Sequence, residues 1–210
     1  MTRTRNNPGV RGFTLLEVIV AVAVASMMAL ALATVMSTVA RTINGAGDER
    51  GALQRGHAAN FRLRAYTTPA LALIQHDPQR GFALWLEDTT PGNTVNLREI
   101  RAVWFNQELG VIELERVSFP EDWPEELKAS FDTQLSPGSD FLSEIQTQRT
   151  LGYTRREDIT DGVTDWALRH DAVLPDASRL FWLTLELDAG QSGARSLVSA
   201  HSLVNYVEPR

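Results

Sequence analysis

A long apolar stretch near the N-terminus dominates the pattern of hydrophobic and polar positions. From residue 13 to residue 40 the only ionisable side chain is Glu17, so the stretch is 28 residues long. A helix needs about 20 apolar residues to cross the hydrocarbon core of a bilayer. Alanine, leucine and methionine, which favour helices, are common in it. The pattern predicts a transmembrane helix over residues 13–40, of which residues 13–35 would span the bilayer.

After residue 40 the chain becomes polar but keeps a helical spacing. At intervals of three or four residues it places Leu53, His57, Phe61 and Arg64. On or near the same side it places Ala52, Ala59, Leu63 and Tyr66. Pro69 predicts that the helix ends near Thr68, because the residue before a proline disfavours the α conformation. Residues 41–68 therefore form a predicted helical stem, which extends the first helix to about 56 residues, or roughly 84 Å.

Four glycines weaken the middle of this long helix. They are Gly45, Gly47, Gly51 and Gly56. Each costs about 1 kcal/mol relative to alanine in a helix. We therefore expect a soft or broken point in residues 44–51. The alternative is a disordered linker that is followed by a separate short helix.

Residues 69–210 have the pattern of half-buried strands and the length of one domain. Apolar or alternating runs occupy residues 82–86, 100–105, 112–115, 181–187 and 196–207. Such alternation is typical of antiparallel strands with one buried face. In the last run we expect one face to carry Val198, Ala200, Val204 and Tyr206. Residues 106–110 and 190–193 predict hairpin turns. The fold class is therefore α+β, with a long N-terminal helix and an antiparallel, β-rich head.

Residues 120–156 are polar, contain several prolines and alternate little. This composition predicts a long loop with one short helix at Glu125–Phe131. Within it, the acidic residues of segment 121–126 surround Trp123. The segment is either a solvated loop or a docking surface for another subunit or a secreted cargo.

The charges around the apolar stretch predict its orientation. Residues 1–12 carry three arginines and no acid, and the next arginine is Arg41. This asymmetry predicts a cytoplasmic N-terminus and a C-terminal domain outside the cytoplasm. A secretory signal peptide, cleaved for example after Ala31, and a plain single-pass anchor would share this order of charges. Both leave Glu17 unexplained, since a charge at that depth in hydrocarbon is costly.

Residues 12–17 read Gly-Phe-Thr-Leu-Leu-Glu. This string closely resembles the cleavage and methylation signal of type IV pilins and of type II secretion pseudopilins. The resemblance implies that residues 1–12 are a leader, that a prepilin peptidase cuts between Gly12 and Phe13, and that Phe13 becomes N-methylated. It also implies a helix that is half in the membrane and half packed on a pseudopilin head.

The same resemblance gives Glu17 a role in assembly, in which it pairs with the terminal amine of a neighbouring subunit. Glu17 lies four residues after Phe13, so the two share a helical face. Pairing with the amine of its own chain, or a protonated carboxyl in lipid, are the alternatives.

A second resemblance involves Gly162, Val163 and Trp166, in the order Gly-Val-x-x-Trp. It is similar to the stretch before the final hairpin of J-type minor pseudopilins. The chain also has no cysteine, so it lacks the C-terminal disulfide loop of many type IV pilins. We therefore expect a minor pseudopilin at the tip of the type II secretion pseudopilus, which supports protein secretion across the outer membrane. The alternatives are a minor pilin of a type IV pilus or competence system, or a single-pass membrane-anchored envelope protein.

The resemblance implies a location in the bacterial inner membrane, with a periplasmic head, and in the pseudopilus after assembly. The implied partners are prepilin peptidase, other minor and major pseudopilins, the inner-membrane assembly platform and membrane lipid. A net charge of -6 and the lack of a basic stripe argue against nucleic acid as a partner.

The residues suggest no catalytic, cofactor or metal site. The four histidines lack the spacing of metal ligands; they are His57, His76, His170 and His201. Asp158, Asp161 and Asp165 lack the spacing of a calcium-binding loop and predict a turn before Val163. No GxSxG, P-loop or Rossmann pattern occurs. We therefore expect a structural subunit and not an enzyme.

Overall fold

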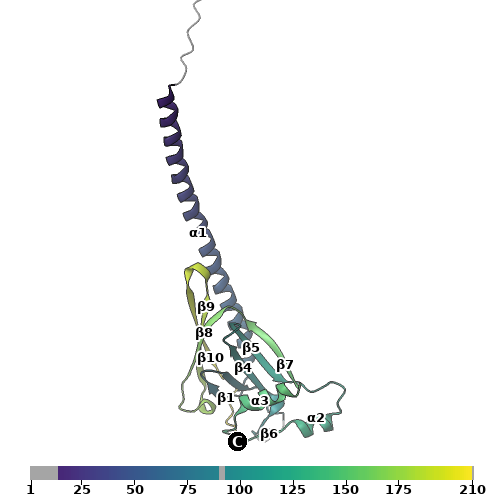
Figure 1. Cartoon of the computed structure of the whole chain (residues 1–210). Coiled ribbons are helices and arrows are strands. Elements are labelled where there is room, and N and C mark those ends of the chain that lie inside the picture. Colours follow the sequence, from purple (N-terminus) through teal and green to yellow (C-terminus); the bar gives the residue numbers. More distant parts are fainter. Residues whose placement is uncertain (1–13, 90–92, 210) are drawn as a thin grey trace, which may run out of the picture. The chain divides into compact units, whose positions relative to one another are not determined.

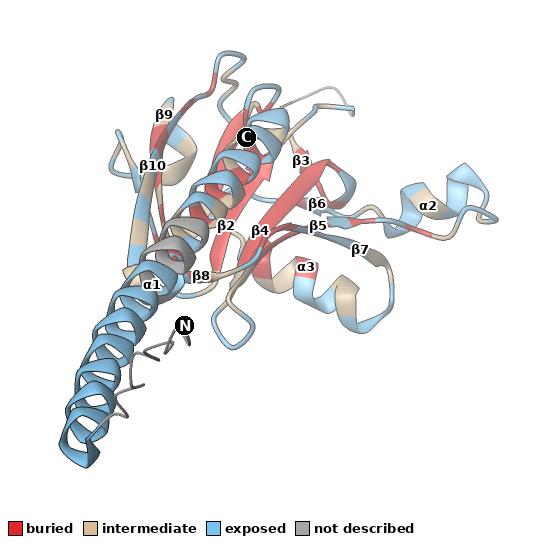
Figure 2. Ribbon diagram, turned by 90° about the horizontal axis from the view of Figure 1, so that it is seen from above, coloured by how far each residue is buried: buried red, intermediate tan, exposed pale blue. Residues whose placement is uncertain are grey.

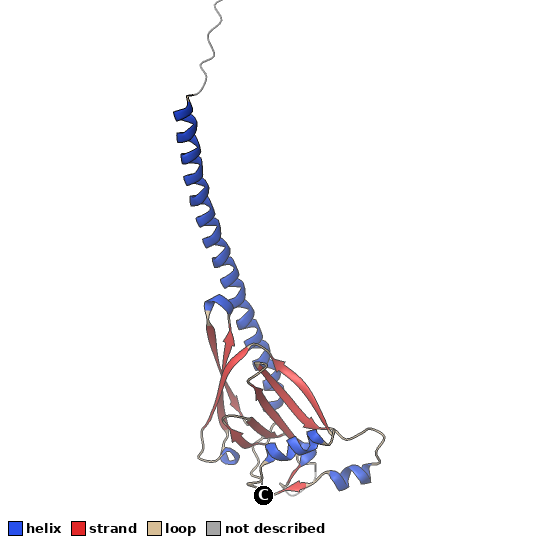
Figure 3. Cartoon of the chain, viewed as in Figure 1, coloured by secondary structure: helices blue, strands red, loops and turns tan. Residues whose placement is uncertain are grey.

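The computed structural model describes residues 14–89 and 93–209. The chain divides into two compact units, Met1–Gly45 and Ala46–Arg210. We call the second of these the head unit. An α+β fold with antiparallel strands, as expected, is confirmed (Figures 1 and 3).

A long helix, α1, runs from Leu15 to Thr67. Its end agrees with the prediction from Pro69. The expected broken point at residues 44–51 is corrected, because α1 is continuous there, whereas a soft point in these residues stays a prediction. The alternative, a linker followed by a separate short helix, is wrong for the same reason, since residues 41–67 all belong to α1. The cost of each glycine is small, and packing of the following turns in the head unit outweighs it.

The remaining elements follow α1 in the head unit. In chain order they are β1 (Ala72–Asp77), β2 (Gly81–Trp85), β3 (Val95–Asn96), η1 (Leu97–Glu99), β4 (Ile100–Asn106), β5 (Val111–Val117), α2 (Glu125–Phe131), β6 (Gln134–Leu135), α3 (Phe141–Thr150), β7 (Thr154–Thr160), β8 (Val163–His170), η2 (Pro175–Ala177), β9 (Leu180–Asp188), η3 (Gly190–Ser192) and β10 (Ala194–Ser202).

The part of α1 in the head unit buries a row of mostly small residues. The row consists of Ala52, Gly56, Ala59, Leu63 and Thr67. A Cβ atom on Gly56 would lie 2.8 Å from Leu187 Cδ1 and 3.0 Å from Leu197 Cδ2. The helix can therefore approach β9 and β10 this closely only without a side chain at residue 56. The predicted grouping was wrong in part, since Leu53 is 41% and Phe61 78% exposed.

The strands of the head unit form three antiparallel sheets, of which the smallest pairs β3 with β6 and the other two build most of the core. Of these two, the larger has the strand order β1-β2-β4-β5-β7, and the smaller has the order β10-β9-β8. One face of the larger sheet shares a core with α1 and the smaller sheet; this core includes Leu63, Leu84, Val103, Leu114 and Phe181. The other face shares a second core with α3, which includes Trp85, Ala102, Phe141, Leu142 and Ile145. The central strands β2 and β4 are buried (Figure 2).

Strand β10 differs from its prediction. It ends at Ser202, so Val204 and Tyr206 lie beyond it. The face expected to be apolar is exposed, with Val198 at 63%. The buried side carries Ser199 and His201. Alternation gave the period of the strand correctly, but it could not show that the core would accept two hydrogen-bonded polar residues.

Residues 120–156 contain more structure than the predicted loop. The short helix α2 is confirmed, but α3 and the start of β7 were not predicted. Asp140 begins α3, because its side chain accepts a hydrogen bond from the Ser143 N–H at 3.1 Å. An N-cap residue followed by apolar residues at helical spacing was the available signal.

Both predicted hairpin turns are confirmed. Between β4 and β5, the Asn106 side chain accepts a hydrogen bond from the Leu109 N–H, and Gly110 has a φ of 62°. Residues 190–193 connect β9 to β10.

Candidate membrane anchor and assembly segment

In the N-terminal unit, α1 exposes a continuous apolar surface. Leu15–Ala40 is long and apolar enough to cross a membrane, by its length and composition. Its 26 residues extend about 39 Å, which exceeds a hydrocarbon core of about 30 Å. None of its most apolar window is buried by other parts of the chain. The segment is therefore compatible with a membrane anchor.

The few hydroxyl groups in this segment bond to its own backbone. Ser26 and Thr34 donate to the carbonyl groups four residues earlier, at 2.8 and 2.9 Å. Ser37 and Thr38 both donate to the Thr34 carbonyl. Because lipid offers no hydrogen-bond partner, such bonds let these residues sit in hydrocarbon at low cost.

Glu17 lies in the first turn of α1 and forms a capping box with Thr14. The N–H and the hydroxyl group of Thr14 both donate to Glu17 Oε2, at 2.8 and 3.0 Å. In return, the Glu17 N–H donates to Thr14 Oγ1 at 3.3 Å. The box satisfies N–H groups that would otherwise lack a partner at the start of the helix. Sequence analysis missed this role of Thr14, although Thr-x-x-Glu before an apolar run is its signature.

The capping box leaves half of the carboxylate available. Both hydrogen bonds from Thr14 reach Oε2, and no described residue donates to Oε1. The helix face around Glu17 is apolar and includes Val20, Ala21 and Val24. Among residues 14–89 and 93–209, no lysine or arginine forms an ion pair with this carboxylate. A cation that reached Oε1 could therefore pair with Glu17 while the cap stays formed.

The two other residues of the predicted processing site, Gly12 and Phe13, lie outside the described residues. Both fall within a match to a known protein family. Residues 7–33 match the family described as the prokaryotic N-terminal methylation motif. The chain has a type IV pilin-like N-terminus. The match includes Gly12, Phe13 and Glu17, and it indicates a protein that is processed as a prepilin. No curated protein matches the chain.

In the head unit, the segment around Trp123 is anchored by the aromatic ring of this residue. Trp123 stacks on Phe119, with ring centroids 5.8 Å apart, and also contacts Phe131 and Tyr153. Helix α2, which follows, buries none of its residues and lies at the periphery (Figures 1 and 2). The acidic side chains of segment 121–126 are therefore exposed to solvent beside this cluster of aromatic rings.

The turn predicted before Val163 is confirmed, but of the three aspartates only Asp161 lies in it, since Asp158 is in β7 and Asp165 is in β8. Gly162 has a φ of 66°, and the Asp165 carboxylate accepts a hydrogen bond from the Trp166 N–H. Asp161 lies 3.6 Å from Arg55. The described residues contain no group of three or more side chains placed to hold a metal ion.

His201 is a buried structural residue. Its Nδ1 lies 3.0 Å from Thr67 Oγ1, and its Nε2 lies 2.9 Å from Ser199 Oγ. Its ring stacks on Phe181. Burial, together with the positive charge of Arg64, lowers the pKa of His201 to about 4. The ring therefore stays neutral at pH 7 and ties the end of α1 to β10.

Two acids that sequence analysis did not single out are buried in the head unit. Glu99 accepts hydrogen bonds from Trp85 Nε1, the Asn96 N–H and Thr89. Glu115 is fully buried and pairs with Arg149 of α3, whose Nε lies 2.9 Å from its Oε1. Both acids are satisfied within the fold, so they hold the structure together.

Proposed function

We propose that this protein is a minor pseudopilin of a type II secretion system, most like the J-type subunit. The observation that carries the proposal is the position of Glu17. It is the single acid in the exposed, apolar segment Leu15–Ala40, and it lies within a match to the N-terminal methylation motif. A segment selected only for hydrophobicity would not retain it.

In this proposal, prepilin peptidase cuts between Gly12 and Phe13 and methylates the Phe13 amine. The leader arginines are lost, and a new ammonium group appears at the edge of the bilayer. Glu17 keeps its cap from Thr14 and offers Oε1 to the ammonium group of a neighbouring subunit. The two charges neutralise each other as the helices assemble, which removes the cost of an unpaired carboxylate in lipid.

The C-terminal half of the head supports the J-type assignment within this proposal. Val163 and Trp166 are buried at the start of β8, and Gly162 makes the turn that precedes them. Strand β8 comes directly before the hairpin of β9 and β10. This is the place in which the Gly-Val-x-x-Trp resemblance puts these residues.

The proposed protein is an inner-membrane subunit with its head in the periplasm. It enters the tip of the pseudopilus beside other minor pseudopilins, on an assembly platform in the inner membrane, and it supports secretion across the outer membrane. A minor pilin of a type IV pilus or competence system shares the same N-terminus and is the second candidate.

N-terminal mass spectrometry of the protein from its native membrane tests the processing step. We expect a mature chain that begins with N-methyl-Phe13. Gly12→Val should block this processing, because the peptidase requires a small residue before the cut, whereas Gly9→Val in the same leader should not. An intact leader in the unsubstituted chain, or a chain that begins near residue 32, would contradict the proposal.

Replacement of Glu17 tests its role in filament assembly, and deletion of the gene tests whether the protein serves secretion or a pilus. Glu17→Gln should be processed normally but recovered in isolated filaments at less than about a tenth of the normal amount. Deletion of the gene should stop secretion across the outer membrane and leave surface pili and DNA uptake intact. Normal secretion with a defect in pili or DNA uptake would favour the second candidate instead.

A further inference from the structure

Three arginines lie in register across neighbouring strands of the larger sheet. Arg101 of β4 pairs directly with Arg116 of β5, and Arg116 pairs with Arg155 of β7. Residues that face each other in this way project from the same side of a sheet. Like charges placed directly opposite destabilise a sheet. We call Arg101, Arg116 and Arg155 the arginine ladder.

The chain neutralises this ladder poorly. Arg101 is nearly buried and donates to two backbone carbonyl groups, and the nearest acid, the exposed Glu87, is 4.0 Å away. Burial, and then the charge of Arg116, lower the pKa of Arg101. Neither Arg116 nor Arg155 has a hydrogen bond or an ion pair within the described parts of the chain, and both are exposed.

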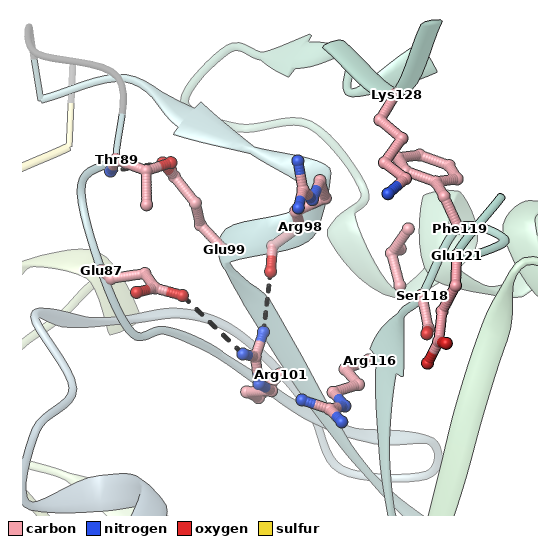
Figure 4. Close-up of a pocket in the computed structure, with 11 residues that line it drawn as sticks. Glu87, Thr89, Arg98, Glu99, Arg101, Arg116, Ser118, Phe119, Glu121 and Lys128 are labelled. Carbon is pink, nitrogen blue, oxygen red and sulfur yellow. Dashed lines mark hydrogen bonds and ion pairs between the residues drawn. The ribbon is translucent and has the colours of Figure 1, made fainter. Parts of the chain in front are cut away.

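Two hollows meet on the ladder. One has a volume of about 370 Å³ and is lined by Arg101, Arg116, Arg98, Lys128 and Phe119, among others. The other, of about 240 Å³, shares Arg101 and Arg116 and adds Arg155, Leu86 and Tyr66. Figure 4 shows the guanidinium groups of Arg101 and Arg116 side by side in the first hollow. Because they share Arg101 and Arg116, we call the two hollows together the trough; its lining is mostly polar and includes five cationic side chains, with Leu86 and Phe119 beside them.

Four acids line the two hollows, and two of them are engaged by hydrogen bonds away from the ladder. Glu99 is occupied by hydrogen bonds within its own loop. Glu157 accepts a hydrogen bond from the Tyr66 hydroxyl group. Glu87 and Glu121 line the first hollow but form no hydrogen bond with Arg116. Among residues 14–89 and 93–209, no acid therefore forms an ion pair with Arg116, the central arginine of the ladder.

We propose that this trough binds an acidic segment of another protein in an extended conformation, with its carboxylates on the arginine ladder. The ladder crosses two strand spacings, about 10 Å, which is too long for one phosphate group. Side chains at positions i and i+2 of an extended peptide point the same way about 7 Å apart, so alternate acids can reach successive arginines. Guanidinium groups bind carboxylates through paired hydrogen bonds. The inference does not depend on which filament the protein joins.

The test uses the full chain in detergent micelles and a short fluorescent peptide of alternating glutamate and alanine. The same peptide with glutamine in place of glutamate is the control ligand. Arg116→Gln removes the central charge of the ladder. Arg169→Gln on β8 is the matched control, since Arg169 is also an exposed strand arginine with no pair among the described residues.

We expect the glutamate peptide to bind and the glutamine peptide not to bind. Arg116→Gln should weaken binding at least about tenfold, and Arg169→Gln less than about twofold. Arg116→Gln should also raise the thermal midpoint of the head, because it relieves like-charge repulsion. Unchanged affinity in Arg116→Gln, or a lower thermal midpoint, would overturn the proposal. Displacement of the peptide by an equal concentration of inorganic phosphate would overturn it in favour of a small-anion site.

Discussion

In the N-terminal unit, every polar side chain from Thr14 to Thr38 bonds to a residue three or four positions away. In the head unit, several buried polar contacts join residues that are far apart in the chain. Glu115 and Arg149 are separated by 34 positions, and Thr67 and His201 by 134. The first pattern suits a helix that must be complete by itself in lipid. The second makes each head residue depend on several elements at once.

The two units should therefore respond differently to a substitution. A change in the N-terminal unit should alter only the turn that contains it. A change at a buried polar contact of the head should destabilise the whole head. All five tryptophans lie between residues 85 and 182, so tryptophan fluorescence during urea unfolding of the full chain in detergent reports on the head alone.

The largest effect is expected for Arg149→Ala. It removes the partner of Glu115, which is fully buried, and leaves that carboxylate without a counter-charge. It also removes a guanidinium group that lies 5.0 Å above the Trp104 ring. We expect the free energy of unfolding to fall by about 3 to 5 kcal/mol, measured by urea titration.

A matched control shows whether burial or distance along the chain decides this effect. Arg195 pairs with Glu49 over 146 positions, but both side chains are about 40% exposed. Arg195→Ala should therefore cost less than about 1 kcal/mol. Equal losses for Arg149→Ala and Arg195→Ala would show that the burial of Glu115 is not what matters.

The next effect concerns pH and His201. Its pKa is lowered to about 4 in the fold but returns to its ordinary value of about 6.5 on unfolding. The unfolded chain therefore binds more protons between these values, and stability falls as pH falls from about 6.5 to about 4. The loss should reach roughly 3 kcal/mol over this interval.

Substitution of the histidine isolates its share of this pH dependence. The urea midpoint of the full chain is measured at several pH values, beside that of His201→Gln, which keeps polar atoms near Thr67 and Ser199. The variant should be less stable at pH 7 and should lose less stability on acidification. Parallel curves for the two proteins would contradict the role given to His201.

A smaller effect distinguishes two glycines of α1 within the head unit. Gly56→Ala gains about 1 kcal/mol of helix propensity but must displace Leu187 and Leu197, which costs more. At Gly51 an added Cβ meets only the end of Arg55, at 3.6 Å. We expect Gly56→Ala to lower stability by about 1 kcal/mol and Gly51→Ala to raise it by a similar amount. Equal and positive changes would show that the helix can move away from the strands.

These residues also show how far the sequence could predict the molecule. The apolar helix, Glu17, the turn at residues 106–110 and helix α2 depend on local patterns, and sequence analysis found them. The packing role of Gly56 was missed, because the sequence alone does not distinguish a glycine that only weakens a helix from one that lets a strand pack closely against it. The pairing of Glu115 with Arg149 depends on how α3 packs on the larger sheet, and the register of the arginine ladder depends on strand order. Alternation alone gives neither.

The smallest effect on overall stability should follow from Thr14→Ala. This substitution tests whether the hydrogen bonds of the N-terminal unit act only on their own turn of α1. The substitution removes the hydroxyl group that accepts from the Glu17 N–H and donates to Glu17 Oε2, so the first turn of α1 loses about 1 kcal/mol. Thr14→Ser keeps both bonds and is the control. In micelles, amide hydrogen exchange of residues 15–18 should become about fivefold faster in Thr14→Ala and stay unchanged in Thr14→Ser. The urea midpoint reported by tryptophan should not move in either variant.

A shift of that midpoint would mean that the first turn is coupled to the head. The contrast between a helix with short-range hydrogen bonds and a head with long-range hydrogen bonds would then fail. If exchange alone changes, Glu17 is held by its own turn before any neighbour arrives, and Oε1 is already oriented for an incoming cation.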